Sequence, residues 1–284
     1  MAPRSPHTYS NTHDDPNDHN TSPLTGARIH MADEVLTEQR GKVLLISLNR
    51  PEQRNSVNRA LAEALARALE HLDNSPELSV GVLTGNGKGF SAGMDLKAFV
   101  EGGMPNLPGR GFAGIVEHAA RKPLIAAVEG FALAGGLEIA LSCDLLVAAK
   151  GSRLGIPEVG VGLFAAAGAL LRLPRVLPYK LAMEMALTAD PIDAERAYAL
   201  GLVNRLVEPG EALTAAIELA ERIARNAPLG LAASKELIRE QQGRTESEFW
   251  AYQEAMLGSV FSSADAIEGA TAFAEKRPPR WTGE

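Results

Sequence analysis

The chain has 284 residues, of which 45% are hydrophobic and 22% are charged, and its formal net charge at pH 7 is −7. This length allows one large domain, or a core with a smaller C-terminal piece, and the negative charge argues against a nucleic-acid surface as the main function. A single cysteine, Cys143, excludes an internal disulfide framework and suits a reducing, cytoplasmic compartment.

The first thirty residues differ from the rest of the chain. Residues 1–30 are rich in Asn, Asp, His, Pro, Ser and Thr, with almost nothing to bury, so we predict a disordered N-terminal tail. They also lack the basic and then apolar pattern of a secretory signal. The longest apolar tract, residues 123–149, is interrupted by Glu129, Glu138 and Asp144, so no membrane span is expected.

The next part of the chain alternates apolar runs of strand length with segments of helical period. Ser56 is the expected N-cap of the first helix, a second helix begins near Met94, and a third carries Glu138. The expected strands lie before, between and after these helices, at residues 43–48, 78–84, 124–128 and 145–149. This succession of strands and helices indicates an α/β core.

From Pro178 onward the sequence is mostly helical. Pro228 and Gly243 mark breaks between helices, and a short strand is expected at residues 203–207. The predicted helices cover residues 181–187, 193–200, 211–226, 229–242, 246–261 and 264–275.

Two glutamates, Glu138 and Glu158, each lie in a stretch that otherwise resembles apolar core. An unpaired buried carboxylate costs several kcal/mol or keeps its proton. Two of them, close in sequence, indicate paired acid–base chemistry near neutral pH. The structural alternative is that each carboxylate caps a helix or forms an ion pair with an arginine such as Arg153 or Arg172.

Two turns of small residues accompany the glutamates. One lies within residues 88–97, after an expected strand, and the other is formed by Ala134, Gly135 and Gly136, just before Glu138. Small residues allow sharp turns whose exposed N–H groups suit an anion or a developing oxyanion. Together, the two turns and the two carboxylates predict a site that polarises a carbonyl and moves protons beside it.

At these residues the chain resembles the enoyl-CoA hydratase/isomerase (crotonase) superfamily, from about Val35 to the C-terminus. The resemblance implies an α/β fold: a crotonase-type spiral of ββα units over residues 31–205, with a helical C-terminal region over residues 206–284 for oligomerisation and CoA contact. The matching segments are residues 49–51 with Asn55, 90–97, 134–138 with 143–144, 157–158, 197–201 with Val203, and 272–277.

The resemblance also implies roles for single residues. Glu138 is expected to activate water for attack at Cβ, and Glu158 to supply the Cα proton. The backbone N–H groups of Met94 and Gly135 are expected to form the oxyanion hole that holds the thioester oxygen. The expected CoA contacts, the last two often from a neighbouring subunit, are Ala92, Leu96, Lys97, Phe273 and Lys276.

These expectations describe an enoyl-CoA hydratase, which adds water syn to a trans-2-enoyl-CoA in fatty-acid or related acyl-CoA breakdown. The partner is an acyl-CoA thioester, no metal or other cofactor is implied, and no nucleic-acid or membrane partner is expected. Because the family forms trimers, often paired into hexamers, a homotrimer or hexamer is expected. The alternatives are an enoyl-CoA isomerase, a carnitinyl-CoA-type dehydratase, and a non-catalytic acyl-CoA-binding or RNA-binding member. An isomerase needs only one base, so the presence of both glutamates favours hydration.

One segment departs from the family's pattern. After Glu158, the hydratase sequence normally continues through a glycine, a proline and a glycine pair. This chain has no proline there and has alanines at two of the glycine positions, in the segment 162–169. The added methyl groups predict a reshaped wall of the acyl pocket and a preference for longer or branched acyl chains over crotonyl-CoA.

Overall fold

The computed structural model describes residues 28–32 and 34–284. The predicted disordered tail, residues 1–30, therefore lies outside the described residues except for its last three, which belong to strand β1 (Arg28–Ala32). In the described part of the chain, no helix is both long enough and apolar enough to cross a lipid bilayer.

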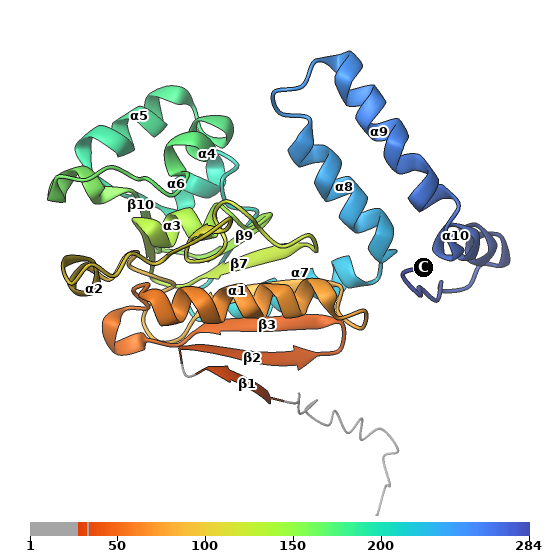
Figure 1. Ribbon diagram of the computed structural model, residues 1–284, viewed down its shortest axis with the longest axis horizontal. Coiled ribbons are helices and arrows are strands. Elements are labelled where there is room, and N and C mark those ends of the chain that lie inside the picture. Colours follow the sequence, from red (N-terminus) through yellow and green to blue (C-terminus); the bar gives the residue numbers. More distant parts are fainter. Residues whose placement is uncertain (1–27, 33) are drawn as a thin grey trace, which may run out of the picture.

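The centre of the molecule is a seven-stranded sheet in the order β1-β2-β3-β4-β7-β9-β12 (Figure 1). Strands β1 to β3 pair antiparallel, and β3, β4, β7, β9 and β12 pair parallel. The strands after β1 are β2 (Val35–Arg40), β3 (Val43–Leu48), β4 (Val80–Gly85), β7 (Leu124–Val128), β9 (Leu145–Ala149) and β12 (Arg205–Val207).

The predicted strands at residues 43–48, 124–128 and 145–149 are confirmed with the same limits. The strand predicted at residues 78–84 begins two residues later, at Val80. Leu78 instead donates its N–H to the carbonyl of Ser75, at 3.1 Å, in the turn that precedes the strand.

Both faces of this sheet are covered at its centre, which explains why β3, β4, β7 and β9 are mainly apolar. Along β3, Leu44 and Ile46 point to the cluster that contains helix α1 (Arg59–Asn74), whereas Val43 and Leu45 point to the opposite cluster. Helix α7 (Ala212–Ala224) covers that second face with buried alanines spaced four residues apart, at positions 212, 216, 220 and 224. These small side chains allow α7 to lie close to the strands.

The first helix begins at a different cap from the one predicted. Asn58, not Ser56, is the N-cap of α1, and its side chain accepts a hydrogen bond from the N–H of Leu61 at 2.9 Å. The reason is that Val57 forms a parallel bridge with Met94, so the chain stays extended through residue 57.

A second, smaller layer lies over the carboxyl ends of the parallel strands. It contains a three-stranded sheet in the order β11-β10-β8, which the sequence analysis did not predict. β8 follows β7 and β10 follows β9, so long and short strands alternate before each helical turn, as a ββα spiral requires. The elements are β8 (Phe131–Leu133), α3 (Gly135–Ala140), β10 (Arg153–Gly155), the 3₁₀ helix η2 (Pro157–Val161), α4 (Ala169–Val176), α5 (Tyr179–Thr188), β11 (Ile192–Asp193) and α6 (Ala194–Ala199).

Shorter elements precede this layer. A single 3₁₀ turn, η1 (Pro51–Gln53), follows β3, and helix α2 (Leu96–Val100) follows the first turn of small residues. The hairpin of β5 (Asn106–Leu107) and β6 (Gly111–Phe112) continues the chain towards β7.

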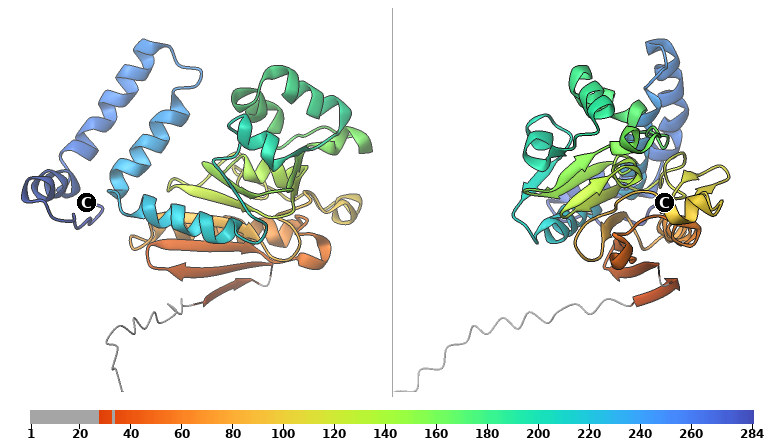
Figure 2. Two further views of the ribbon diagram at one scale, coloured as in Figure 1. Left: turned by 180° about the vertical axis from the view of Figure 1, so that it is seen from behind. Right: turned by 90° about the vertical axis from the view of Figure 1, so that its left-hand side faces the viewer.

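The last three helices project from the body of the molecule, as Figure 1 and the left-hand view of Figure 2 show. They are α8 (Pro228–Glu240), α9 (Glu246–Phe261) and α10 (Ala264–Glu275). Lys235 attaches α8 to the core, because its Nζ lies 2.6 Å from Asp144 Oδ2 and donates to the carbonyl of Lys122 at 2.8 Å. Pro228 occupies the first turn of α8, where its missing N–H has no intrahelical partner to lose.

Candidate active site

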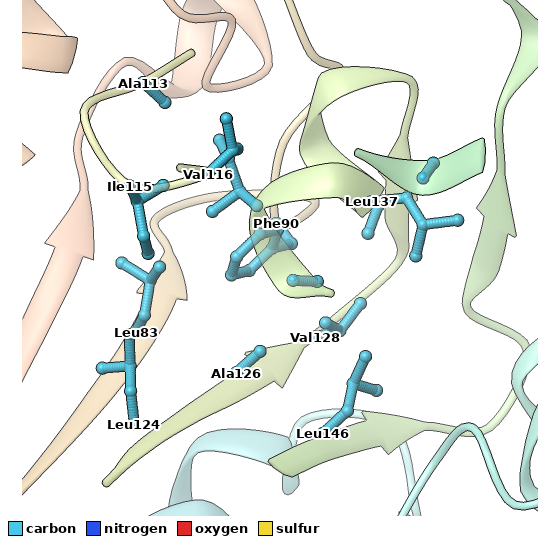
Figure 3. Close-up of a cluster of buried hydrophobic side chains, with 14 of the residues drawn as sticks. Leu83, Phe90, Ala113, Ile115, Val116, Leu124, Ala126, Val128, Leu137 and Leu146 are labelled. Atoms are coloured by element: carbon cyan, nitrogen blue, oxygen red, sulfur yellow. The ribbon is translucent and has the colours of Figure 1, made fainter. Parts of the chain in front are cut away.

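The first turn of small residues is held in place by the hydrophobic core, against which it packs. Phe90 is fully buried, and Figure 3 shows its ring among Val116, Leu137 and Val128. The next residue, Ser91, donates from Oγ to the carbonyl of Asn55 at 2.8 Å and accepts from the N–H of Gly93 at 3.1 Å. The chain then turns at Gly93, whose φ of +90° is readily available only to glycine.

The second turn lies directly against the first. A Cβ atom on Gly93 would lie 2.7 Å from the nitrogen of Gly135, and one on Gly136 would lie 2.2 Å from the carbonyl oxygen of Ser91. Both positions therefore require glycine. Between them, Ala134 has φ 51° and ψ −132°, a conformation that L-residues rarely adopt. Its N–H donates to the carbonyl of Gly155 at 2.9 Å, which ties the turn to β10.

The structure brings the two predicted oxyanion donors together. Among the backbone hydrogen bonds of the described residues, neither the N–H of Met94 nor that of Gly135 is a donor. Both groups belong to the paired turns, and the ring of Phe112 packs beside Gly135. Two adjacent N–H groups without acceptors can stabilise a negative charge that develops on a carbonyl oxygen.

Glu138 lies one turn into α3 and is only 2% exposed. Its Oε1 accepts from the N–H groups of Ala167 at 2.7 Å and Ala169 at 3.0 Å, so it caps the start of α4, as the structural alternative proposed. Oε2 has no hydrogen-bond partner among the described residues, which leaves it available to a water molecule. Burial raises the pKa of Glu138, while the two N–H groups and the charge of Arg172 act in the opposite direction.

Glu158 lies in η2 and has a different environment. Burial, together with repulsion from Glu138, raises the pKa of Glu158 to about 7, against a smaller lowering by its own backbone N–H. Its Oε2 is buried and has no hydrogen-bond partner in the described part of the chain. None of the ion pairs between described residues includes either glutamate, so the alternative of a salt bridge to Arg153 or Arg172 is wrong.

These environments favour opposite roles for the two carboxyl groups. Glu138 accepts two hydrogen bonds that stabilise its ionised form, which suits a general base. Glu158 lacks such donors at Oε2 and titrates near neutrality, so a large fraction holds a proton that it can give away.

The predicted CoA contacts fall into two separate groups. Ala92 lies in the first turn, and Leu96 and Lys97 follow it at the exposed start of α2, which Asp95 caps. Phe273, 88% exposed, and Lys276 lie at the end of α10. Figures 1 and 2 show α2 and α10 at opposite ends of the molecule, so one chain does not bring the two groups together.

The segment that departs from the family's pattern borders an apolar cavity. Ala165 lines this cavity of about 410 Å³ together with Ile156 and Val159, which flank Glu158 on either side in sequence. Phe164 of the same segment and residues of α4 and α5 form the remaining walls. The alanines at positions 167 and 169 are the residues that donate to Glu138, so the segment both shapes a cavity and holds a candidate catalytic group.

Sequence reasoning missed two residues of this site. Phe112 was not singled out, although its ring contacts the turn at Gly135. Arg172 was considered only as an ion-pair partner, whereas its guanidinium donates to the carbonyls of Ala167 and Val116. The available signal was a pair of arginines, Arg172 and Arg175, in a helix at residues 169–176 that otherwise has only apolar residues.

Cys143 is held in the core instead of the site. Its Sγ lies 3.6 Å from the carbonyl oxygen of Ile139, and burial raises the pKa of its thiol, so it stays protonated at neutral pH. Within the residues that the structure describes, no group of three or more His, Cys, Asp or Glu side chains is placed to hold a metal ion.

Comparisons with known proteins agree with this geometry. The family model for enoyl-CoA hydratase/isomerase matches residues 38–284. A carnitinyl-CoA dehydratase of Salmonella typhi is 40% identical over 262 residues, which cover 89% of this chain and all of that protein. The solved structure of enoyl-CoA hydratase EchA1 from Mycobacterium marinum is 57% identical, with a TM-score of 0.87, and covers 89% of this chain and all of that chain.

A carnitinyl-CoA hydratase from Mycobacterium avium, also of known structure, is 42% identical with a TM-score of 0.71 over the same shares of the two chains. The family model covers most of the chain, and each of these relatives is matched over its full length. The crotonase-type fold and its helical C-terminal region are thereby confirmed. The chain belongs to the enoyl-CoA hydratase/isomerase family.

Proposed function

We propose that this protein is an enoyl-CoA hydratase that adds water reversibly to a trans-2-enoyl-CoA and forms a 3-hydroxyacyl-CoA. The observation on which the proposal rests is the pair of unlike carboxyl groups beside the paired turns. Glu138 accepts two N–H bonds at Oε1, and Glu158 has a buried Oε2 without a partner in the described residues. This is the arrangement expected of one base and one acid.

In the proposed reaction, the thioester oxygen accepts hydrogen bonds from the N–H groups of Met94 and Gly135. These donors stabilise the enolate that forms when the nucleophile attacks, and each is worth roughly 3–4 kcal/mol of transition-state stabilisation. Glu138 removes a proton from water at its free Oε2 while the oxygen bonds to Cβ. Glu158 gives its proton to Cα as the enolate collapses, and in the reverse direction the two groups exchange roles.

Steady-state hydration assays test this proposal. The purified protein is mixed with crotonyl-CoA or with longer 2-enoyl-CoAs, and the loss of the conjugated enoyl absorbance is followed. We expect catalysed hydration of at least one substrate, with the 3-hydroxyacyl-CoA as product by chromatography. A protein that binds acyl-CoA but catalyses neither hydration nor dehydration would instead be the non-catalytic alternative.

Dehydration of carnitinyl-CoA is the second candidate. It is favoured by the 40% identity to a carnitinyl-CoA dehydratase over that protein's full length. The same assay, run with carnitinyl-CoA, decides between the two, because a higher kcat/KM for carnitinyl-CoA than for every unbranched substrate would place dehydration first. Double-bond migration without water uptake would indicate an isomerase.

The acyl preference is proposed from the departing segment. The segment 162–169 lacks the family's proline, and its Ala165 borders a cavity of about 410 Å³ next to Glu158, so we expect room for a longer or branched acyl group. One methylene in an apolar pocket is worth roughly 1–3 kcal/mol, which is enough to change preference about ten-fold. A maximum of kcat/KM at crotonyl-CoA would contradict this proposal.

We also propose that the active protein is a homotrimer or hexamer. Support comes from the distance between the two groups of CoA residues within one chain, and from exposed apolar side chains on the projecting helices, such as Ile238 and Phe261. Sedimentation should give a trimer or hexamer, and deletion of residues 263–284 should weaken CoA binding. A stable monomer with unchanged CoA affinity would contradict the assembly but not the fold.

A further inference from the structure

We propose that Arg172 is a positioning residue for the hydration reaction, and that it acts by clamping the turn that holds Glu138. The inference rests on the function proposed above and adds to it a residue outside the two carboxyl groups and the two N–H donors. It starts from the first turn of α4, where Arg172 lies between buried Ala169 and Leu173 and the half-buried guanidinium turns back over the start of its own helix.

The guanidinium contacts two segments that are far apart in sequence. Nη1 donates to the carbonyl of Ala167 at 3.3 Å, and Nη2 donates to the carbonyl of Val116 at 2.5 Å. Val116 belongs to the loop after β6, and it packs against Phe90 beneath the first turn (Figure 3). Arg172 therefore links the loop that borders the oxyanion turns to the segment that precedes α4.

Gly168 shows how closely this clamp fits. Its φ is +104°, and a Cβ atom there would lie 2.1 Å from Nη1 of Arg172. The guanidinium thus lies against the backbone of Gly168, between Ala167 and Ala169. These two neighbours are the residues whose N–H groups donate to Oε1 of Glu138, at 2.7 Å and 3.0 Å. The guanidinium of Arg172 and the carboxylate of Glu138 therefore both bond to the backbone of the same turn, residues 167–169.

The positive charge of Arg172 supports the same role as its contacts, because it favours the ionised form of Glu138. Arg172 has no carboxylate within ion-pair distance in the described part of the chain, and its positive charge lowers the pKa of Glu138. Arg239 of α8 and Arg175 of α4 face Arg172 and oppose its charge, whereas Glu138 and Cys143 favour it. Glu158 faces Glu138 from η2. An arginine stays protonated at neutral pH despite burial, so this favourable charge is always present.

A purely structural role for Arg172 makes a different prediction. If the guanidinium only joined two loops, its removal would reduce stability and leave the chemistry of the remaining folded enzyme unchanged. If it positions Glu138, removal also changes the ionisation and orientation of that carboxylate. The pH dependence of kcat/KM separates the two, because its acidic limb follows the ionisation of the base in the free enzyme.

The test compares Arg172→Gln and Arg172→Lys with the wild type and with Arg175→Gln. Arg175 is a matched control, since it is an exposed arginine in the same helix with no hydrogen bond to the site. For Arg172→Gln we expect kcat to fall by at least about ten-fold, KM to change by less than about two-fold, and the acidic limb to move to higher pH. Arg172→Lys should keep the limb near its wild-type position, because it keeps the charge, but lose part of kcat. Arg175→Gln should match the wild type.

An infrared titration makes the outcome independent of turnover. Two backgrounds are compared, the wild type and Arg172→Gln. In each, the difference spectrum between the protein with Glu138 and its Glu138→Gln variant reports the ionisation of Glu138. A rise in the pKa of Glu138 in the Arg172→Gln background supports the inference, even if the wild type hydrates no enoyl-CoA and the proposed function fails. If Arg172→Gln does not fold, the kcat of Arg172→Lys decides. An unshifted carboxyl band, or a wild-type kcat in Arg172→Lys, would overturn the inference.

Discussion

The raised pKa of Glu158 predicts a pH-dependent cost in stability that Glu158→Gln should remove. The carboxyl titrates near 7 in the folded protein against an ordinary value of 4.5, a difference of 7 − 4.5 = 2.5. At 1.36 kcal/mol for each pKa unit, this corresponds to at most about 3.4 kcal/mol. Because Glu158 is only partly buried, we expect about 2 kcal/mol.

The sign follows from which state binds the proton more tightly. The folded state keeps the proton to higher pH, so the cost is absent below about pH 4.5, grows up to about pH 7, and is complete above it. The glutamine form has no such titration. Relative to the wild type, Glu158→Gln should therefore gain stability as pH rises through this window.

Urea unfolding of both proteins across this pH range measures the effect. Protein concentration must be the same throughout, because an oligomer's apparent stability depends on it. Glu138→Gln serves as a comparison, since two hydrogen bonds partly offset the rise in the pKa of Glu138 that burial causes, and Glu138 should show a smaller dependence. A stability difference between wild type and Glu158→Gln that does not change with pH would refute the reasoning about Glu158.

Three further variants test the turns and the attachment of the C-terminal helices. Ala134→Gly should relieve a strained backbone conformation. After the entropy cost of glycine, the net gain in the free energy of unfolding is about 1 kcal/mol, which should raise the melting temperature in thermal unfolding by a few degrees. Gly93→Ala should lower hydration by at least about 100-fold in kinetic assays, because its methyl group would lie 2.7 Å from the nitrogen of Gly135. Lys235→Met should lower the free energy of unfolding in urea by about 2 kcal/mol, because it leaves Asp144 without its ion-pair partner. If the property measured for one of these three variants does not change, the reasoning for that variant is contradicted.

The sequence was informative where a local pattern decides the structure. The strand at residues 43–48 is buried at every position and apolar at all but Ser47, because both sheet faces are covered, so its limits could be read directly. The cap of α1 could not, because the bridge between Val57 and Met94 joins residues 37 positions apart and keeps the chain extended past Ser56. The short strands β8 and β10 were missed since three residues are too few for an alternating pattern.

The same distinction applies to the site. Glu138 and Glu158 could be found because a carboxylate in an apolar run is unusual in any sequence. That Glu138 also caps α4 depends on the close approach of residues about thirty positions apart, which no local pattern reports. The contacts of Arg172 with Val116 and of Phe112 with Gly135 are equally non-local, and they required the folded chain.

The most direct test of the proposed mechanism is the hydration rate of the best enoyl-CoA substrate by the wild type, Glu138→Gln and Glu158→Gln. Each substitution keeps the size of the side chain and removes its ability to exchange a proton. If the two carboxyl groups are the base and the acid, each variant should lose at least about 100-fold in kcat and still bind the CoA ester in calorimetry. Near-wild-type hydration by either variant would contradict the account, because the corresponding glutamate would then have no part in the reaction.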